Sequence, residues 1–175
     1  MRIQLTEILS ADGQALHREV PLERDTMEVG AERFRLFEKS PVTLDIVHTG
    51  DRVIEIEGSC EASAKIPCGR CLEEVDISFA LHISRKVDLK ESDEERVREL
   101  DEGNFITGTE LDVEQLVYNE LLVQWPMRVL CREDCKGLCS RCGANLNNKP
   151  CDCDRTSLDP RMAAICDIFS EYKEV

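Results

Sequence analysis

Ten cysteines are the residues of this 175-residue chain whose type and spacing could do chemistry. Six of them follow the pattern C-x3-C-x3-C-x2-C-x8-C-x-C, at Cys131, Cys135, Cys139, Cys142, Cys151 and Cys153. A structural zinc ion takes four tetrahedral ligands, and the C-x2-C-G turn of Cys139 and Cys142 brings two sulfurs to one ion. The stretch has few large apolar residues, so a metal would replace the missing core. The pattern predicts that the segment from Cys131 to Cys153 binds zinc.

A second C-x2-C turn lies in mid-chain, where Cys68 and Cys71 supply half of a tetrahedral site. Cys131 and Cys135 are the pair available to complete it. We therefore predict two zinc sites, one of Cys139, Cys142, Cys151 and Cys153, and one of Cys68, Cys71, Cys131 and Cys135. Because cysteines at C-x-C spacing can share or exchange ligation, a single site made of another four of the eight stays open.

The other thiols and the imidazoles are not expected to bind metal. Cys60 and Cys166 fall on the apolar faces of their own elements, where free cysteine acts as a small buried hydrophobe. We expect both in the core. His17, His48 and His82 have no partner at ligand spacing, and His48 and His82 fit the polar sides of strands.

A thiol oxidoreductase is the enzymatic alternative. A C-x2-C pair can be a redox dithiol, and Arg70 between Cys68 and Cys71 would favour the thiolate. Redox turns usually begin a helix after a strand in a βαβ unit, whereas this turn lies between two strands. The sequence has no Gly-rich phosphate loop and no nucleophile elbow. We therefore expect no catalytic residue and no enzymatic activity.

The elements that position the mid-chain turn are predicted to be β-strands. Apolar and polar residues alternate strictly from Arg52 to Lys65 and again from Val75 to Leu89, which is typical of half-buried strands. The connection Pro67–Glu74 is short, so the strands should be antiparallel neighbours with the Cys68 turn at the hairpin tip. Pro41–His48 and the start of the chain provide further strand candidates.

Helical spacing follows Asp112, which with Gln115 resembles a capping box. This predicts a helix over 112–124 that Trp125 and Pro126 end. A short helix from Pro160 would pack back on the body through Met162, Ile165, Cys166 and Phe169.

These patterns predict an α+β fold. Its main part is an antiparallel β-sheet, sandwich or barrel-like, with a few helices and a small Cys-rich zinc-binding C-terminal segment. Residues 1–126 should form the β body, and residues 127–175 a zinc knuckle plus a short helix packed on that body. The charged stretch Glu91–Asn104 is assigned to a solvated loop or a short exposed helix.

The composition excludes some classes of function. No apolar run approaches the roughly 20 residues of a membrane span, and Met1–Leu9 alternates instead of forming a secretory signal. We expect a cytoplasmic protein, where thiols stay reduced and clustered cysteines hold metal more often than disulfides. The net charge of −14 argues against general affinity for nucleic acid, DNA included, and suits a basic partner protein.

Direct contact with RNA is the alternative to contact with protein. Basic residues cluster around the cysteines, at Arg132, Lys136, Arg141, Lys149 and Arg155. Acidic neighbours such as Glu133, Asp134 and Asp152 dilute that charge, which favours ordinary solvated charges around a metal site.

Three segments resemble the bacterial YceD family: PCGRCLEEVDISF, VLCREDCKGLCSRCGANLN after a helix, and CDCDRTSLDPRMAAI. The resemblance extends from about Val42 onward. It implies a non-enzymatic role in ribosome biogenesis, linked to accumulation of large-subunit ribosomal RNA. With the acidic charge, it suggests a basic ribosomal protein or a pre-ribosomal particle as partner. Members differ in how many of these cysteines they carry, so zinc is expected to stabilise the fold.

Overall fold

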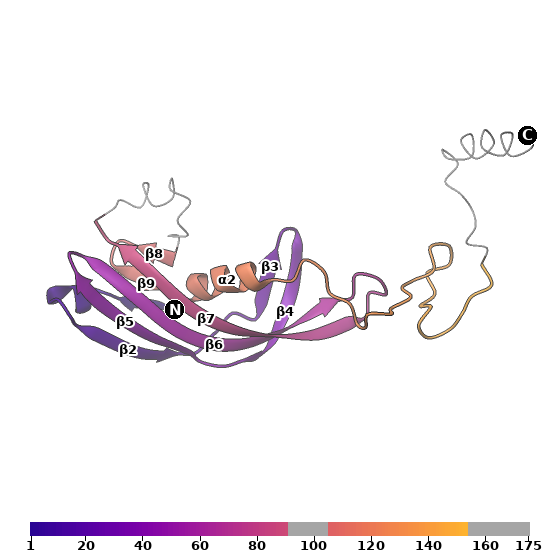
Figure 1. Cartoon of the computed structure of the whole chain (residues 1–175), viewed down its shortest axis with the longest axis horizontal. Helices are drawn as coiled ribbons and strands as arrows, with labels where there is room; N and C mark the ends of the chain where they lie inside the picture. The colour runs from indigo at the N-terminus through magenta and orange to yellow at the C-terminus, as the bar shows by residue number, and fades with distance from the viewer. Residues whose placement is uncertain (91–104, 154–175) are drawn as a thin grey trace, which may run out of the picture. The chain divides into compact units, whose positions relative to one another are not determined.

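The computed structural model describes residues 1–90 and 105–153, and these residues belong to two compact units. Unit 1 comprises Met1–Pro67 and Glu74–Val129, and unit 2 comprises Cys68–Glu73 and the chain from Leu130. The hairpin tip therefore belongs to the same unit as the cysteine-rich segment. Figure 1 shows the elements in chain order.

Unit 1 is built on two long strands, β6 (Val53–Pro67) and β7 (Glu74–Asp88). They pair antiparallel along their whole length without a register shift. Ile54, Ile56 and Leu81 on the apolar side are almost fully buried, because alternate side chains of a strand point to one face. The predicted hairpin is confirmed.

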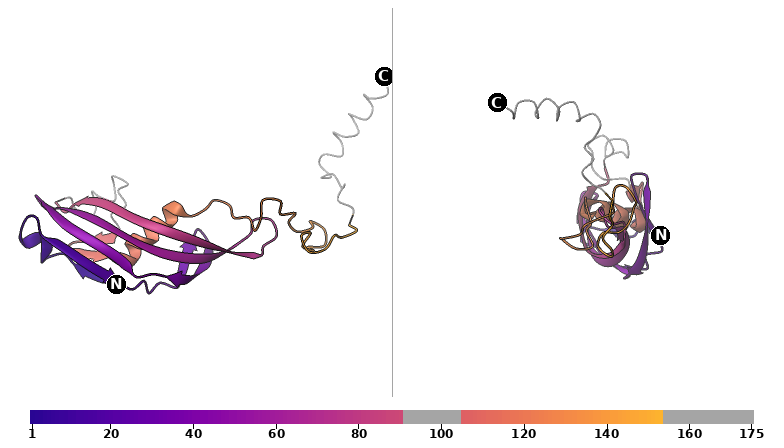
Figure 2. Two further views of the ribbon diagram at one scale, coloured as in Figure 1. Left: turned by 60° about the horizontal axis from the view of Figure 1, so that its bottom comes forward. Right: turned by 90° about the vertical axis from the view of Figure 1, so that its right-hand side faces the viewer.

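The other edge of β6 is shared by two strands. β5 (Val42–Gly50) pairs with the first half of β6, and β4 (Glu32–Lys39) pairs with the second half. β2 (Ala15–Val20) extends the sheet beyond β5, and β3 (Thr26–Val29) extends it beyond β4. The resulting six-stranded sheet is strongly curved, as Figures 1 and 2 show.

A smaller sheet adds three short strands, β1 (Arg2–Gln4), β8 (Ile106–Thr107) and β9 (Glu110–Asp112), in the order β1-β9-β8. A 3-10 turn, η1 (Ile8–Ser10), follows β1. Every strand pairing in the described residues is antiparallel, and the predicted class of an antiparallel β protein with a Cys-rich segment is confirmed.

The helix α2 (Val113–Gln124) lies on the concave side of the sheet in Figure 1. The Asp112 carboxylate accepts hydrogen bonds from the backbone N–H groups of Glu114 and Gln115, as an N-cap does. The Gln115 side chain donates to Asn119 instead of reaching back to the cap, so only half of the expected capping box forms. None of the helices among the described residues is long and apolar enough to cross a membrane.

Polar and aromatic contacts fix α2 on β7. The buried Glu120 carboxylate of α2 lies 2.7 Å from the guanidinium of Arg85 on β7. Beyond the last turn, Trp125 stacks on Phe79 with 5.4 Å between ring centroids and lies 5.0 Å from Phe34 of β4. The residue that ends the helix therefore also anchors it.

Two expectations about single side chains have different outcomes. Cys60 is 4% exposed and belongs to the core, as predicted. The placement of His48 on a polar side was wrong. His48 continues the inward alternation of β5, is 4% exposed, and its Nδ1 lies 3.1 Å from the carbonyl oxygen of Ala11. Cys166, the helix expected from Pro160 and the stretch Glu91–Asn104 lie outside the described residues.

Gly58 of β6 is the position where the sheet leaves no room for a side chain. A Cβ there would overlap the carbonyl oxygen of Thr43 and lie 2.7 Å from Cδ2 of Leu44. Gly58→Ala should therefore lower the free energy of unfolding by about 1–3 kcal/mol, measured by urea denaturation. Ser59→Ala, on the exposed side of the same strand, should change it by less than about 0.5 kcal/mol. Equal effects of the two substitutions would contradict the close approach of β5 and β6 at Gly58.

Candidate metal centres

The hairpin tip presents Cys68 and Cys71 on a tight turn. The backbone N–H of Cys68 donates to the carbonyl of Glu73 at 2.8 Å, and Leu72 donates back to Cys68 at 3.0 Å. Leu72 adopts a left-handed φ of 61°, which is unfavourable for a side chain of this size. The conformation of Leu72 therefore costs free energy, which interactions around the turn must offset.

Arg70, inside this turn, binds the segment that carries Cys135. Its guanidinium donates to the carbonyl oxygen of Cys135 at 2.8 Å and to that of Glu133 at 3.3 Å. Its own carbonyl accepts from Leu138 at 3.0 Å. Gly137 has a φ of 75° and lies against the backbone of Arg70, where an added Cβ would come within 2.9 Å of the Arg70 carbonyl oxygen. Arg70 therefore has a structural role in joining the two segments of unit 2.

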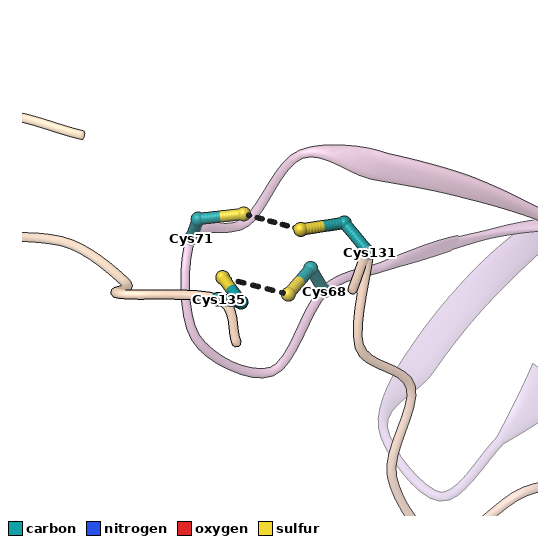
Figure 3. A group of neighbouring side chains, drawn as sticks. All are labelled: Cys68, Cys71, Cys131 and Cys135. Carbon is teal, nitrogen blue, oxygen red and sulfur yellow. Dashed lines mark hydrogen bonds between the residues drawn. The ribbon is translucent and has the colours of Figure 1, made fainter. Parts of the chain in front are cut away.

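The first cysteine group, Cys68, Cys71, Cys131 and Cys135, has the dimensions of a metal site. The four Sγ atoms all lie within 4.8 Å of one another. The Sγ atoms of Cys68 and Cys135 are 3.8 Å apart, those of Cys71 and Cys131 are 3.5 Å apart, and the four sulfurs gather in one place in Figure 3. Tetrahedral zinc with Zn–S bonds of about 2.3 Å requires sulfurs about 3.8 Å apart. This group could hold a metal ion.

The second group comes from the Cys-rich segment alone. The Sγ atoms of Cys139, Cys142, Cys151 and Cys153 also lie within 4.8 Å of one another. Cys139 donates to the carbonyl of Ala144 at 2.8 Å and accepts from Gly143 at 2.9 Å, with Gly143 at φ 71°. Glycine adopts this conformation without steric cost, which closes the C-x2-C-G turn. The structure thus brings together both predicted sets of four.

Each group favours one thiolate at the expense of another. Burial opposes ionisation of Cys68, but backbone hydrogen bonds from Cys71, Cys131 and Arg70 lower its pKa to about 6. Backbone hydrogen bonds from Cys142 and Arg141 lower the pKa of Cys139 to about 6.

The opposite shift occurs at the partners of these thiols. A backbone hydrogen bond from Glu73 favours the Cys71 thiolate, but burial and the neighbouring sulfurs raise its pKa to about 12. The hydrogen bond with Cys142, followed by burial, raises the pKa of Cys153 to about 12. Four adjacent thiolates need a cation to offset their repulsion. Because the ligands must lose their protons, metal affinity will fall as the pH falls.

An asparagine that the sequence analysis did not single out supports the first group. Nδ2 of Asn147 donates to Sγ of Cys135 at 3.3 Å and is the largest cause that lowers the Cys135 pKa. Its Oδ1 accepts from the backbone of Lys136 at 2.8 Å. Asn145 and Asn148 both donate to the carboxylate of Glu73, at 2.9 and 3.4 Å. The sequence does contain a sign of this support, because the run Asn145–Asn148 places three amide side chains close to the cysteines.

The basic residues considered for RNA contact have mixed surroundings. Arg132 pairs with Asp134 at 3.4 Å. Lys136, Arg141 and Lys149 are exposed. Arg155 lies outside the described residues.

The comparisons with known proteins identify one family. Its model, described as large ribosomal RNA subunit accumulation protein YceD, matches residues 56–169. An uncharacterised protein of Mycobacterium tuberculosis is 25% identical over 142 residues, which cover 81% of this chain and 68% of that protein. An uncharacterised protein of Mycobacterium leprae is 27% identical over 158 residues, covering 89% and 70%.

A shorter match carries a functional name. The Arabidopsis thaliana protein "Large ribosomal RNA subunit accumulation protein YCED homolog 1, chloroplastic" is 36% identical over 50 residues, which are 29% of this chain and 16% of that protein. No solved structure matches.

Replacing one ligand of the first group should remove one metal ion. We expect the wild-type chain, purified without added metal, to hold two ions, and Cys68→Ser to hold one, as measured by elemental analysis. Cys60→Ala changes a core thiol outside both groups and should keep both ions. Loss of metal from both variants alike, or from neither, would contradict the assignment.

The amide of Asn147 should slow metal release from the first group. Outer-shell partners of this kind change metal affinity by about 10–100-fold, so Asn147→Ala should release one of the two ions correspondingly faster to a chelator with a colorimetric readout. Asn148→Ala removes a neighbouring amide that donates to Glu73 and has no hydrogen bond to a cysteine sulfur among the described residues, so this variant should release metal at the wild-type rate. If both variants behave alike, the hydrogen bond to Cys135 has no role in metal retention.

Proposed function

The chain belongs to the YceD family of large ribosomal RNA subunit accumulation proteins, and from this premise we propose that it supports accumulation of large-subunit ribosomal RNA. It acts as a non-enzymatic factor in ribosome biogenesis, in the cytoplasm, through contact with a basic ribosomal protein or a pre-ribosomal particle.

One observation carries the proposal. The family match covers residues 56–169, which include the greater part of β6, all of β7 and α2, and both cysteine groups. The matched region is therefore most of the molecule and not a single shared motif. The Arabidopsis protein, whose name states the same role, adds support over a shorter stretch. A role in ribosomal RNA accumulation is the activity that these matches favour.

The charge of the chain favours a protein partner over RNA. The net charge of −14 opposes contact with phosphates and attracts basic surfaces. The described part of unit 2 carries five basic and four acidic side chains, so it is nearly neutral before any metal is bound. Four thiolates exceed the charge of a divalent ion, so each occupied site adds negative charge. RNA contact through this unit is the alternative, and a binding that weakens steeply with salt would revive it.

We further propose that zinc occupies both cysteine groups. Sets of four thiolates with tetrahedral spacing are typical of structural zinc sites, and zinc bound there would contribute directly to the folding of unit 2. The same arrangement counts against a thiol oxidoreductase at Cys68 and Cys71. Their sulfurs lie beside those of Cys135 and Cys131 and would be ligands and not a free dithiol.

Depletion of this protein in its own cells should lower large-subunit ribosomal RNA relative to small-subunit ribosomal RNA, measured by quantitative RNA electrophoresis. The wild-type gene and Cys60→Ala should restore the ratio. The double variant Cys68→Ser, Cys139→Ser, which removes a ligand from each group, should restore it less because unit 2 would not fold.

An unchanged ratio after depletion would overturn the proposed role. Purification of the tagged chain from the same cells, with analysis of both protein and RNA, tests the mode of contact. Recovery of ribosomal proteins that persists after nuclease treatment supports protein contact, whereas recovery that nuclease abolishes supports the RNA alternative.

A further inference from the structure

We propose that the outer edge of β7 binds an extended, Lys- or Arg-rich segment of the partner protein as an additional β-strand. This inference rests on the proposed function for the class of partner and adds the surface and the mode of binding. Three features of β7 favour such binding: the direction of its backbone hydrogen bonds, the regularity of the strand and the charges beside it.

The hydrogen bonds at the two ends of the hairpin establish which backbone groups of β7 face outward. Cys68 donates to Glu73 at one end, and Leu89 donates to Arg52 at the other. The register between these pairs is unbroken, so the odd-numbered residues of β7 bond to β6 throughout. The N–H and C=O groups of the even-numbered residues therefore point to the opposite edge, from Glu74 to Asp88.

In the described residues this edge lacks several of the features that usually block the addition of a strand. Exposed edges are normally protected by short length, proline, bulges, covering segments or charged side chains, and of these β7 has charged side chains, such as Lys86 and the inward-facing Arg85. β7 is 15 residues long and contains no proline, and its pairing with β6 shows no bulge. By contrast, the strands at the other margins of the sheet, β2 and β3, have six and four residues.

The described residues leave the edge accessible. β7 pairs with no described strand except β6, and Figures 1 and 2 show it along the margin of the sheet opposite β5 and β2. Of its eight even-numbered residues, all except Asp88 are exposed. A partner strand could therefore reach the backbone groups between Glu74 and Lys86.

The side chains beside the edge favour a basic occupant. The solvent-facing positions of β6 and β7 carry six acidic residues and two lysines. Both lysines are already paired, Lys65 with Asp76 at 2.7 Å and Lys86 with Glu55 at 2.9 Å. The remaining acidic residues are Glu57, Glu61, Glu74 and Asp88. Alternate side chains of an added strand would lie on this face, where Lys or Arg could approach Glu74 and Asp88 on β7 directly and could reach Glu57 and Glu61 of β6 across the small residues Ser84 and Ala80.

A second copy of the chain fits the edge less well. Antiparallel pairing of two β7 strands centred on Leu81 would place Glu74 opposite Asp88, although it would also place Asp76 opposite Lys86, and it would join two chains that each carry a net charge of −14. Like charges directly opposite each other destabilise a sheet. The charges therefore favour strand addition by a basic segment over self-association.

Proline substitution distinguishes the two edges of β7. Ala80 is even-numbered and exposed, so Ala80→Pro removes an N–H from the outer edge without removing a bond to β6. The probe is a fluorescent peptide of four Lys-Val repeats, and its binding is measured by anisotropy. We expect the full-length wild-type protein to bind it with an affinity that falls with salt, and Ala80→Pro to bind at least tenfold more weakly with an unchanged urea midpoint.

Controls test the mode of binding. A peptide of four Glu-Val repeats should not bind, and Glu61→Gln should weaken binding of the Lys-Val peptide while leaving the fold intact. Amide exchange measured by NMR should show new protection of Ala80, His82 and Ser84 when the peptide is added. Protection confined to these even-numbered residues of β7 would identify strand addition.

Three results would overturn the proposal. They are equal binding by wild type and Ala80→Pro, protection at residues away from β7, and a wild-type dimer whose even-numbered β7 amides are protected without peptide. Failure here leaves the ribosomal RNA measurement unaffected, so it can be told apart from failure of the proposed function. Conversely, peptide binding at β7 together with normal ribosomal RNA levels after depletion would support strand addition at β7 and reject the proposed role in ribosomal RNA accumulation.

Discussion

The repulsion among clustered thiolates is the constraint on which unit 2 depends. In each group four sulfurs lie within 4.8 Å of one another, a separation at which they cannot all ionise without a cation. The opposed pKa shifts within the groups, to about 6 at Cys68 and about 12 at Cys71, express the same conflict. A bound metal ion would resolve it and would replace the hydrophobic core that the described part of this unit lacks. The hydrogen bonds of Arg70 and Asn147 then orient the segments that carry the ligands.

The fold of unit 1 explains why a long hairpin and a cysteine turn occur together. The unbroken register between β6 and β7 fixes the direction of every side chain up to Pro67 and Glu74, where the turn begins. A slip of one residue would exchange the buried and solvent faces of both strands. The same regularity gives β7 its long outer edge. The turn that carries Cys68 and Cys71 and the proposed binding edge thus belong to one hairpin.

The sequence predicted the features that depend on local spacing. The alternation around Ile54 and Leu81 predicted the strands β6 and β7, and the spacing after Asp112 predicted the helix α2. The cysteine pattern predicted two groups of four, and the structure brings both together. Contacts between distant segments were not predictable. The sharing of one edge of β6 by β4 and β5, and the hydrogen bond from the Asn147 side-chain amide to Cys135 Sγ, depend on how the chain folds back, which no local pattern encodes. His48 was misplaced although its strand alternated, because a polar side chain was assumed to face water.

X-ray absorption at the zinc edge, measured on full-length protein purified without added metal, tests whether both cysteine groups hold zinc. We expect two zinc ions per chain, each with four sulfur neighbours at about 2.3 Å and no coordinating nitrogen or oxygen. A metal-free protein with a disulfide between Cys68 and Cys71, or zinc bound by a mixture of sulfur and lighter atoms, would contradict this expectation.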